Sequence, residues 1–340
     1  MTRKLVALSL ALAMVAGLMA GCSSSSSTPS ASPSSASNSP AASAKTTTAK
    51  DMTFVIVPKC VHAWFDEVNK GAVKEAKALE DQLGVTVTIN YMAPESADIV
   101  SQNAVLEQAA ATHPNAIALD PVDLEGSRSI ISEIQNMGIT VILFDGIDAT
   151  GALTYVGNNF AEQASLASEK LASLVNYEGK VAVMQGYPSA SNHAERYQSH
   201  LKTLAQYPNI KVIEGGIDND NVQTAQSQAA ATMAANPDLV GYTNCDACGS
   251  GVAAAIEEAG KAGKITFVAM DNLIEILQYV KKGTITATSS TLPQSQGMLA
   301  VLVMYQATLG LDLPSGLVDT GIGWIDSSNI DEWIKIVSGS

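Results

Sequence analysis

After Asp51 the chain alternates short apolar, β-branched runs with longer runs of helical periodicity, and this alternation restricts its possible folds more than any other feature. The short runs are almost wholly apolar, which is typical of strands that are covered on both faces of a sheet. Strands that alternate with helices predict parallel sheets joined by right-handed crossovers. We therefore expect an α/β fold.

The pattern occurs twice, which predicts two similar doubly wound parallel-sheet domains. In the first half we expect strands over 53–57, 85–89, 116–119 and 140–144, and helices over 65–83, 98–110 and 126–136. In the second half we expect strands over 180–185, 210–215, 239–243 and 265–270, and helices over 194–207, 224–235 and 249–259. Ligands bind beyond the carboxyl ends of the strands in such sheets, so two facing sheets would form a cleft lined from both sides.

The first 21 residues have the features of a secretory signal peptide, with a positive start, an apolar run over 5–19 and small residues before Cys22. The segment 18–22, Leu-Met-Ala-Gly-Cys, is similar to the bacterial lipobox, whose cysteine carries a lipid. We predict lipid anchoring at Cys22 after removal of 1–21, and the alternative is a plain secretory signal. A spanning helix is not expected, because the apolar run is shorter than the roughly 20 residues that a bilayer needs.

Residues 22–50 form a linker that, after Cys22, contains only Ser, Ala, Thr, Pro, Asn and Lys. Such a composition buries no apolar area, so we expect a tether rather than a folded segment. The rest of the chain is long enough for two domains of ordinary size.

The formal net charge is -14, which argues against nucleic acid as a partner, because phosphates need clustered Lys and Arg. No GxGxxG motif follows an expected strand and no GxxxxGK[ST] motif occurs, so nucleotide binding is not indicated either.

Polar and aromatic side chains follow the expected strands of the first half. Lys59, His62, Trp64 and Phe65 come after the first strand, and Asp145 comes after the fourth. Aromatic faces can stack on the C–H face of a sugar ring, while lysine, histidine and carboxylate groups bond its hydroxyls. We expect these five side chains in the cleft. The alternatives are a core position for Phe65 and a turn or capping role for Asp145.

The second half offers Arg196, Asp246 and Asp271. Asp271 and Asp145 hold equivalent positions in the two halves, and Asp246 follows the preceding strand of its half. The guanidinium of Arg196 can bridge a ring oxygen and hydroxyls, or hold the two aspartates in place. Asp120 stands before Pro121, so we expect it to be a turn residue.

No metal, cofactor or enzymatic activity is expected. The alternative is a zinc or redox site, because Cys60, His62, Cys245 and Cys248 are metal-binding types at expected cleft edges. Such a site would span two domains, whereas thiolate sites are normally closed and structural. Cys245 and Cys248 form a CxxC pair that could be a disulfide or stay reduced. No nucleophile, base and orienting group are placed together.

From Met52 to Val337 the chain resembles the periplasmic sugar-binding proteins of ABC importers, of the ribose, galactose and xylose type. Its beginning, Val57-Pro58-Lys59, and the segment Tyr91–Pro94 are similar to the branch that binds rhamnose or autoinducer-2. The resemblance rests on Trp64-Phe65, Phe144-Asp145, Glu195-Arg196, the turn at Asp246, Met270-Asp271 and Thr291-Leu292-Pro293-Gln294.

The resemblance implies the type I periplasmic binding protein fold, with two discontinuous lobes joined by a hinge. Lobe one would hold 51–158 and 292–320, and lobe two 159–291 and 321–340. The implied function is an extracytoplasmic, lipid-anchored monomer that binds a monosaccharide or similar polyol and delivers it to an ABC permease. The alternative is a ligand-sensing receptor for a sensor kinase or a quorum signal.

Several positions depart from the pattern of the pentose binders, which implies a ligand other than ribose. Gly146 replaces an arginine after Asp145, and His62 replaces an asparagine. Cys245 replaces another asparagine, although Asn244 is adjacent, and Thr291 replaces a glutamine. The resemblance adds Asn244 and Thr291 to the expected ligand-binding residues.

Overall fold

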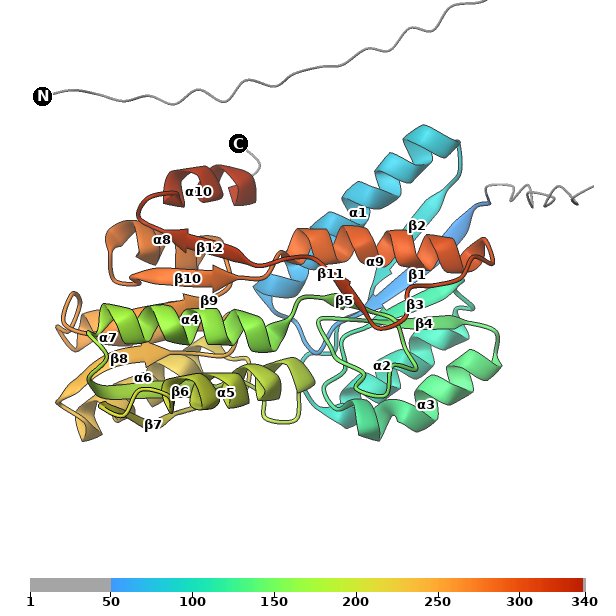
Figure 1. The fold of residues 1–340 in the computed structure, drawn as a ribbon. Helices are drawn as coiled ribbons and strands as arrows, with labels where there is room; N and C mark the ends of the chain where they lie inside the picture. Colours follow the sequence, from blue (N-terminus) through green and yellow to red (C-terminus); the bar gives the residue numbers. More distant parts are fainter. Residues whose placement is uncertain (1–49, 339–340) are drawn as a thin grey trace, which may run out of the picture. The chain divides into compact units, whose positions relative to one another are not determined.

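The computed structural model describes residues 50–338, which contain two six-stranded sheets with helices packed against them (Figure 1). The first sheet has the order β11-β5-β4-β3-β1-β2, and every pair in it is parallel. Its strands are β1 (Met52–Val57), β2 (Val87–Tyr91), β3 (Ala116–Leu119), β4 (Thr140–Phe144), β5 (Tyr155–Gly157) and β11 (Leu317–Asp319). Its helices are α1 (Ala63–Leu83), α2 (Ile99–Ala111), α3 (Leu124–Asn136) and α9 (Pro293–Thr308).

The second sheet has the order β12-β10-β9-β8-β6-β7, with β12 alone antiparallel to its neighbour. Its strands are β6 (Gly179–Gln185), β7 (Ile210–Ile217), β8 (Leu239–Thr243), β9 (Thr266–Met270), β10 (Ala287–Ser290) and β12 (Gly323–Asp326). Its helices are α4 (Phe160–Leu174), α5 (Ser191–Leu204), α6 (Val222–Ala235), α7 (Gly249–Glu258), α8 (Ile274–Lys282) and α10 (Ile330–Ser338). We call the sheets with their helices the first and the second lobe.

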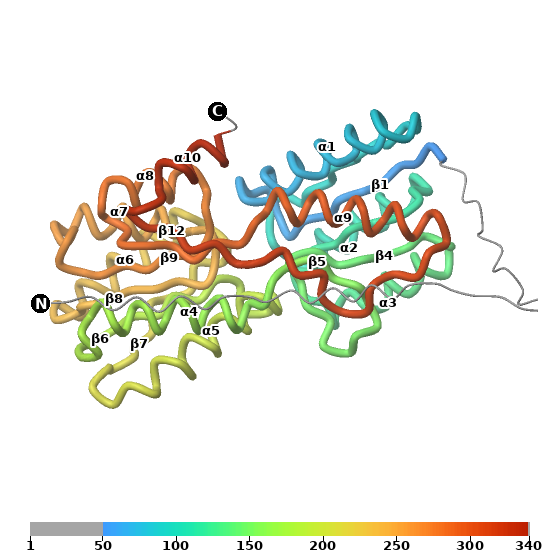
Figure 2. Tube along the Cα trace, turned by 45° about the horizontal axis from the view of Figure 1, so that its top comes forward, coloured from blue at the N-terminus to red at the C-terminus, as the bar shows by residue number. Residues whose placement is uncertain are grey.

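The chain passes between the lobes from β5 to α4, from β10 to α9 and from β11 to β12. Figure 2 shows the last of these connections, which leads from the first lobe back to β12 and α10. Among residues 50–338, no helix combines the length and the apolar character needed to cross a bilayer.

The predicted fold class, two doubly wound parallel sheets, is confirmed, and the central strands are buried as their apolar sequences predict. Several bounds differ by two or three residues from those expected, including the starts of β2 and α5. β2 begins at Val87, because this residue pairs with Met52 at the start of β1. α5 begins at Ser191, three residues before the predicted start. Consequently His193 belongs to its first turn, beside the strand ends.

Helices α1 and α9 approach closely because each carries a glycine at the contact. A Cβ atom on Gly71 would lie 2.0 Å from the carbonyl oxygen of Gln294, and one on Gly297 would lie 1.9 Å from that of Val68. Backbone atoms cannot move aside as a flexible side chain can, so these positions accept no side chain.

We expect Gly71→Ala to lower the free energy of unfolding by about 1–3 kcal/mol, because the added methyl overpacks the contact between α1 and α9. In an ordinary helix the same change raises stability by up to about 1 kcal/mol, since alanine is the better helix former. Urea unfolding of the variant measures the sign. Stabilisation would show that the helices do not meet at Gly71.

Candidate functional site

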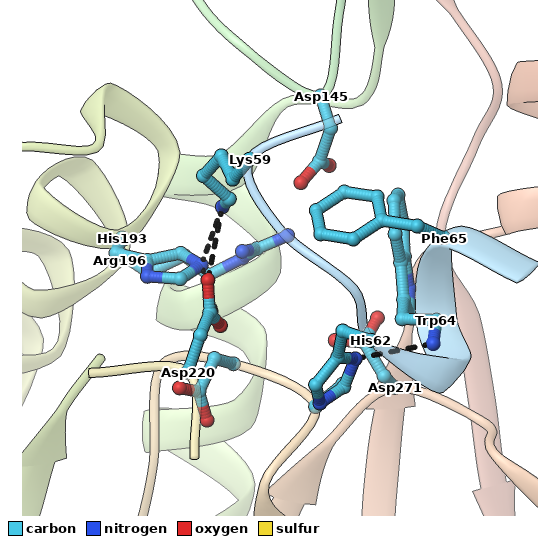
Figure 3. Close-up of a pocket in the computed structure, with 11 residues that line it drawn as sticks. Lys59, His62, Trp64, Phe65, Asp145, His193, Arg196, Asp220 and Asp271 are labelled. Atoms are coloured by element: carbon cyan, nitrogen blue, oxygen red, sulfur yellow. Dashed lines mark hydrogen bonds and ion pairs between the residues drawn. The ribbon is translucent and has the colours of Figure 1, made fainter. Parts of the chain in front are cut away.

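A pocket lies where the carboxyl ends of the two sheets approach each other (Figure 3). It is lined by Lys59, His62, Trp64, Phe65 and Asp145 of the first lobe and by His193, Arg196, Asp220, Asp246, Ala247 and Asp271 of the second. The cavity between these side chains measures only about 20 Å³, which is room for a water molecule rather than a sugar. A larger ligand therefore requires the lobes or the lining side chains to move.

The aromatic wall of the pocket is built by the first turn of α1. His62 caps this helix, since its Nδ1 accepts a hydrogen bond from the backbone N–H of Trp64 at 3.1 Å. Trp64 and Phe65 meet edge to face with ring centres 5.2 Å apart, and both are buried. The indole Nε1 donates to Thr291 Oγ1 at 3.1 Å, which fixes the orientation of the ring.

Lys59 reaches across the pocket from the end of β1 to the second lobe (Figure 3). Its Nζ lies 3.5 Å from Asp220 Oδ2, 3.6 Å from Asp120 Oδ2 and 3.2 Å from His193 Nε2. Burial acts to lower the pKa of Lys59, but the charges of Asp120 and Asp220 outweigh it and hold this pKa above its ordinary value. Lys59 is therefore a buried ammonium group that joins the two lobes.

Asp145 and Asp271 occupy equivalent corners of the two lobes. Both adopt left-handed backbone angles, with φ of 48° and 70°, which are uncommon for non-glycine residues and tend to cluster at functional sites. Asp145 accepts hydrogen bonds from Asn192 Nδ2 and from Gln296 Nε2. Asp271 Oδ1 accepts a hydrogen bond from the hydroxyl of Thr291. Both carboxylates are thus held in place by buried side chains.

Burial raises the pKa of Asp145 to about 6, although the charges of Arg196 and Lys59 act against this. A carboxyl with a raised pKa in the folded state contributes most stability below its ordinary pKa, and this contribution is lost as the pH rises through about 6. Relative to Asp145→Asn, the wild type should therefore be more stable at pH 4 than at pH 7 by up to about 3 kcal/mol. Denaturant unfolding of both proteins at the two pH values measures this. A difference that does not change with pH would contradict it.

Arg196 is fixed in the second turn of α5 by contacts within its own lobe. Its Nε donates to Gln163 Oε1 at 2.9 Å and its Nη1 to the backbone oxygen of Cys245 at 3.2 Å. The guanidinium lies over the ring of Phe160 with 4.5 Å to the ring centre. Only 2% of the residue is exposed, so its charge is held at the pocket without solvent screening.

The structure places eight of the ten predicted ligand-binding residues around the pocket. The other two, Asn244 and Thr291, lie behind it. Asn244 Nδ2 donates to the backbone oxygen of Asp246 at 2.6 Å and its Oδ1 accepts from Met270 N at 3.2 Å, so it shapes the loop after β8. Thr291 links Trp64 to Asp271.

Sequence reasoning missed His193, Asp220 and Ala247, which also line the pocket, and it assigned Asp120 only to a turn. Asp120 is fully buried and faces Lys59. Asp220 follows β7, and its position after a strand was the only feature that could have indicated it. β7 ends at Ile217, two residues later than predicted. His193 had no signal of its own, because its position depends on where α5 begins.

The pocket residues do not suit a metal ion. His193 Nδ1 accepts a hydrogen bond from Tyr187 N at 2.8 Å, and its Nε2 faces the Lys59 ammonium group at 3.2 Å. A positive charge therefore already lies beside His193 and Asp220, where a metal ion would bind. Cys245 and Cys248 are free thiols, and burial raises the pKa of each well above its ordinary value, which disfavours the thiolate that zinc needs.

Two parallel sheets whose strand ends enclose a polar pocket with an aromatic wall define a two-lobed ligand-binding protein. Comparison with known families agrees. The periplasmic binding protein domain family matches residues 53–312, and the chain belongs to this family. The resemblance noted in the sequence is confirmed.

Relatives of known function are similar over most of the chain. The D-allose-binding periplasmic protein of Escherichia coli is 27% identical, over 72% of this chain and 80% of its own. The D-ribose/D-allose-binding protein of Pseudomonas aeruginosa is 21% identical, over 75% and 81%. An ABC transporter solute-binding protein of Burkholderia graminis, solved in complex with D-arabinose, has a TM-score of 0.76 and 27% identity, over 83% and 97%. These relatives are described as binding proteins and not as enzymes, in agreement with the expectation from the sequence.

Proposed function

We propose that this chain is an extracytoplasmic solute-binding protein of an ABC importer that binds a monosaccharide or similar small polyol between its lobes. The observation that carries the proposal is the composition of the pocket. Two aromatic rings stand beside four carboxyl groups and a fixed guanidinium, all lining one small space. Rings stack on the apolar face of a sugar, and charged groups bond its hydroxyls.

Hinge closure is part of the proposal, because several hydrogen bonds join the lobes directly. Asn192 donates to Asp145, and the hydroxyl of Ser191 accepts from Ile147 N at 2.9 Å. Ser189 Oγ donates to the backbone oxygen of Val122 at 3.0 Å. A ligand that contacts both lobes at once would shift the population from an open arrangement toward a closed one with enough room for it, which a permease can then recognise.

The membrane anchor, the partner and the monomeric state stay proposals. The predicted signal peptide, Cys22 and nearly all of the predicted linker lie outside the described residues 50–338. Lipid anchoring at Cys22 is supported by the lipobox-like sequence of residues 18–22. Loss of fatty-acid labelling in the variant Cys22→Ala would test it. The ABC permease as partner is supported by relatives described as ABC transporter solute-binding proteins. A signalling receptor would use the same pocket with a different partner.

The direct test is isothermal titration calorimetry with pentoses, hexoses, their amino derivatives and inositols. We expect saturable binding of at least one compound with one site per chain, and loss of that binding in Trp64→Ala. Trp333→Ala is the matched control, because this indole lies outside the pocket, beside Gly323 of β12. Absence of binding throughout the panel would overturn the proposed function.

A further inference from the structure

Acidic groups outnumber cations around the pocket. Lys59 and Arg196 are the two cationic side chains there, and burial holds the pKa of His193 well below its ordinary value, so this ring is neutral. Six buried or nearly buried carboxyl groups stand in or directly behind the lining, namely Asp120, Asp145, Asp218, Asp220, Asp246 and Asp271. The excess of acid predicts that something positively charged completes the site.

The excess is concentrated at Asp218 and Asp246. Lys59 contacts Asp120 and Asp220, and the charge of Arg196 lowers the pKa of Asp145. Asp271 accepts from the Thr291 hydroxyl, whereas no lysine or arginine of the described residues forms an ion pair with Asp218 or Asp246. Ligand atoms of Asp218 and Asp246 lie within 4.8 Å of each other. Two carboxyl groups at this separation repel each other unless a proton or a cation lies between them.

One oxygen of each group has no hydrogen-bond partner outside the pair. Asp246 Oδ1 accepts from Cys248 N at 3.0 Å, and Asp218 Oδ1 accepts from Asp220 N at 3.1 Å. The buried Oδ2 atoms of the two residues have no partner other than the facing carboxyl group, with which they share a hydrogen bond when one of the two is protonated. Asp246 lines the pocket and Asp218 stands directly behind it, so a ligand group that displaces the shared proton meets Asp246 first.

Building on the proposed function, we propose that the ligand is a monosaccharide-sized polyol with one protonated amino group, which binds at Asp246 and Asp218. An ammonium group has three donors and a full positive charge, so it can bond several carboxylate oxygens and compensate their charge. A neutral hydroxyl donates one hydrogen bond and leaves the charge uncompensated. A metal ion is disfavoured, because the Lys59 ammonium group already lies beside His193 and Asp220, and Cys248 is a buried thiol.

Proton linkage should accompany binding of the amine. Burial raises the pKa of Asp246, and burial together with the charge of Asp246 raises the pKa of Asp218 well above its ordinary value. Asp220, His62, Cys248 and His193 are the other titratable groups that face the pair. The pair therefore holds a proton that an ammonium group displaces. Affinity should rise with pH until the ligand amine itself loses its proton.

The test compares matched sugars by calorimetry: glucosamine with glucose, galactosamine with galactose and mannosamine with mannose, plus the neutral N-acetyl derivatives. We expect at least one amino sugar to bind 10-fold or more tightly than its parent and its N-acetyl derivative. Titrations in buffers of different ionisation enthalpy should show proton release. If parent sugars bind as tightly as every amino sugar, the inference is wrong and the proposed function stands. If no sugar of either kind binds, both fall.

The variant Asp246→Asn tests the site itself. Its control is Asp81→Asn, which removes the same formal charge from an exposed side chain of α1. The amide keeps the shape and can donate to Asp218, so the melting temperature should not fall. We expect the preference for the amine to drop at least 10-fold in Asp246→Asn and to persist in Asp81→Asn. An unchanged preference in Asp246→Asn would place the amino group elsewhere and overturn the assignment.

Discussion

Replacing Lys59 with methionine is expected to lower the free energy of unfolding by about 3–5 kcal/mol, because it leaves Asp120 and Asp220 buried without a counter-charge. Lys59 is only 1% exposed, so water cannot replace the ammonium group. Removing one partner of a buried ion pair costs far more than the pair contributes when both are present. Urea unfolding at pH 7 measures the loss.

The control for this variant is Lys77→Met. Lys77 forms an exposed ion pair with Asp81 on α1, and such pairs contribute at most about 1 kcal/mol. The deficit of Lys59→Met should also shrink at low pH. Lys59 helps to hold the pKa of Asp220 below its ordinary value against the effect of burial, so its contribution is lost as the pH falls through that lowered pKa. Equal stability losses in both variants would show that Lys59 is not buried between the lobes.

Replacing Arg196 with alanine is expected to weaken ligand binding by about 100- to 1,000-fold, the loss of one or two hydrogen bonds from a charged donor. Its contacts with Gln163, Cys245 and Phe160 hold the guanidinium in place before the ligand arrives. The measurement is calorimetry with a compound that the wild type binds.

Arg128→Ala is the matched control. Arg128 is the other arginine among the described residues, and it forms ion pairs with Glu125 and Asp148 away from the pocket. We expect its affinity to match that of the wild type. Asp271→Ala should weaken binding as Arg196→Ala does, since its carboxylate lines the same pocket. If Arg196→Ala and Asp271→Ala both retain full affinity, the ligand does not bind in this pocket.

The sequence located most of the pocket through one local rule. A functional side chain in a doubly wound fold stands just after an apolar strand, and Lys59, Asp145, Asp246 and Asp271 all obey it. Strand ends can be recognised from a few neighbouring residues, because burial on both faces of the sheet requires a continuous apolar run. Trp64 and Phe65 follow from the same rule through the helix that begins after β1.

This rule could not predict which of these side chains contact one another. Lys59 contacts His193 and Asp220, which are distant in sequence, and Trp64 donates to Thr291 across 227 positions. Such contacts depend on how one lobe is placed against the other, and no local pattern encodes this. The orientation of the two histidines is of the same kind, since each Nδ1 accepts a hydrogen bond from a backbone N–H that only the folded loop presents.

The amino-acid sequence by itself therefore determined the class of fold, the edge of each sheet where a ligand binds and the chemical types gathered there, because strand and helix periodicity act over short range. Only the tertiary structure decided which acids have a cation. Charges in a buried pocket interact over a few ångströms regardless of their separation along the chain, so Lys59 pairs with Asp120 and Asp220, while Asp218 and Asp246 face each other without a lysine or arginine.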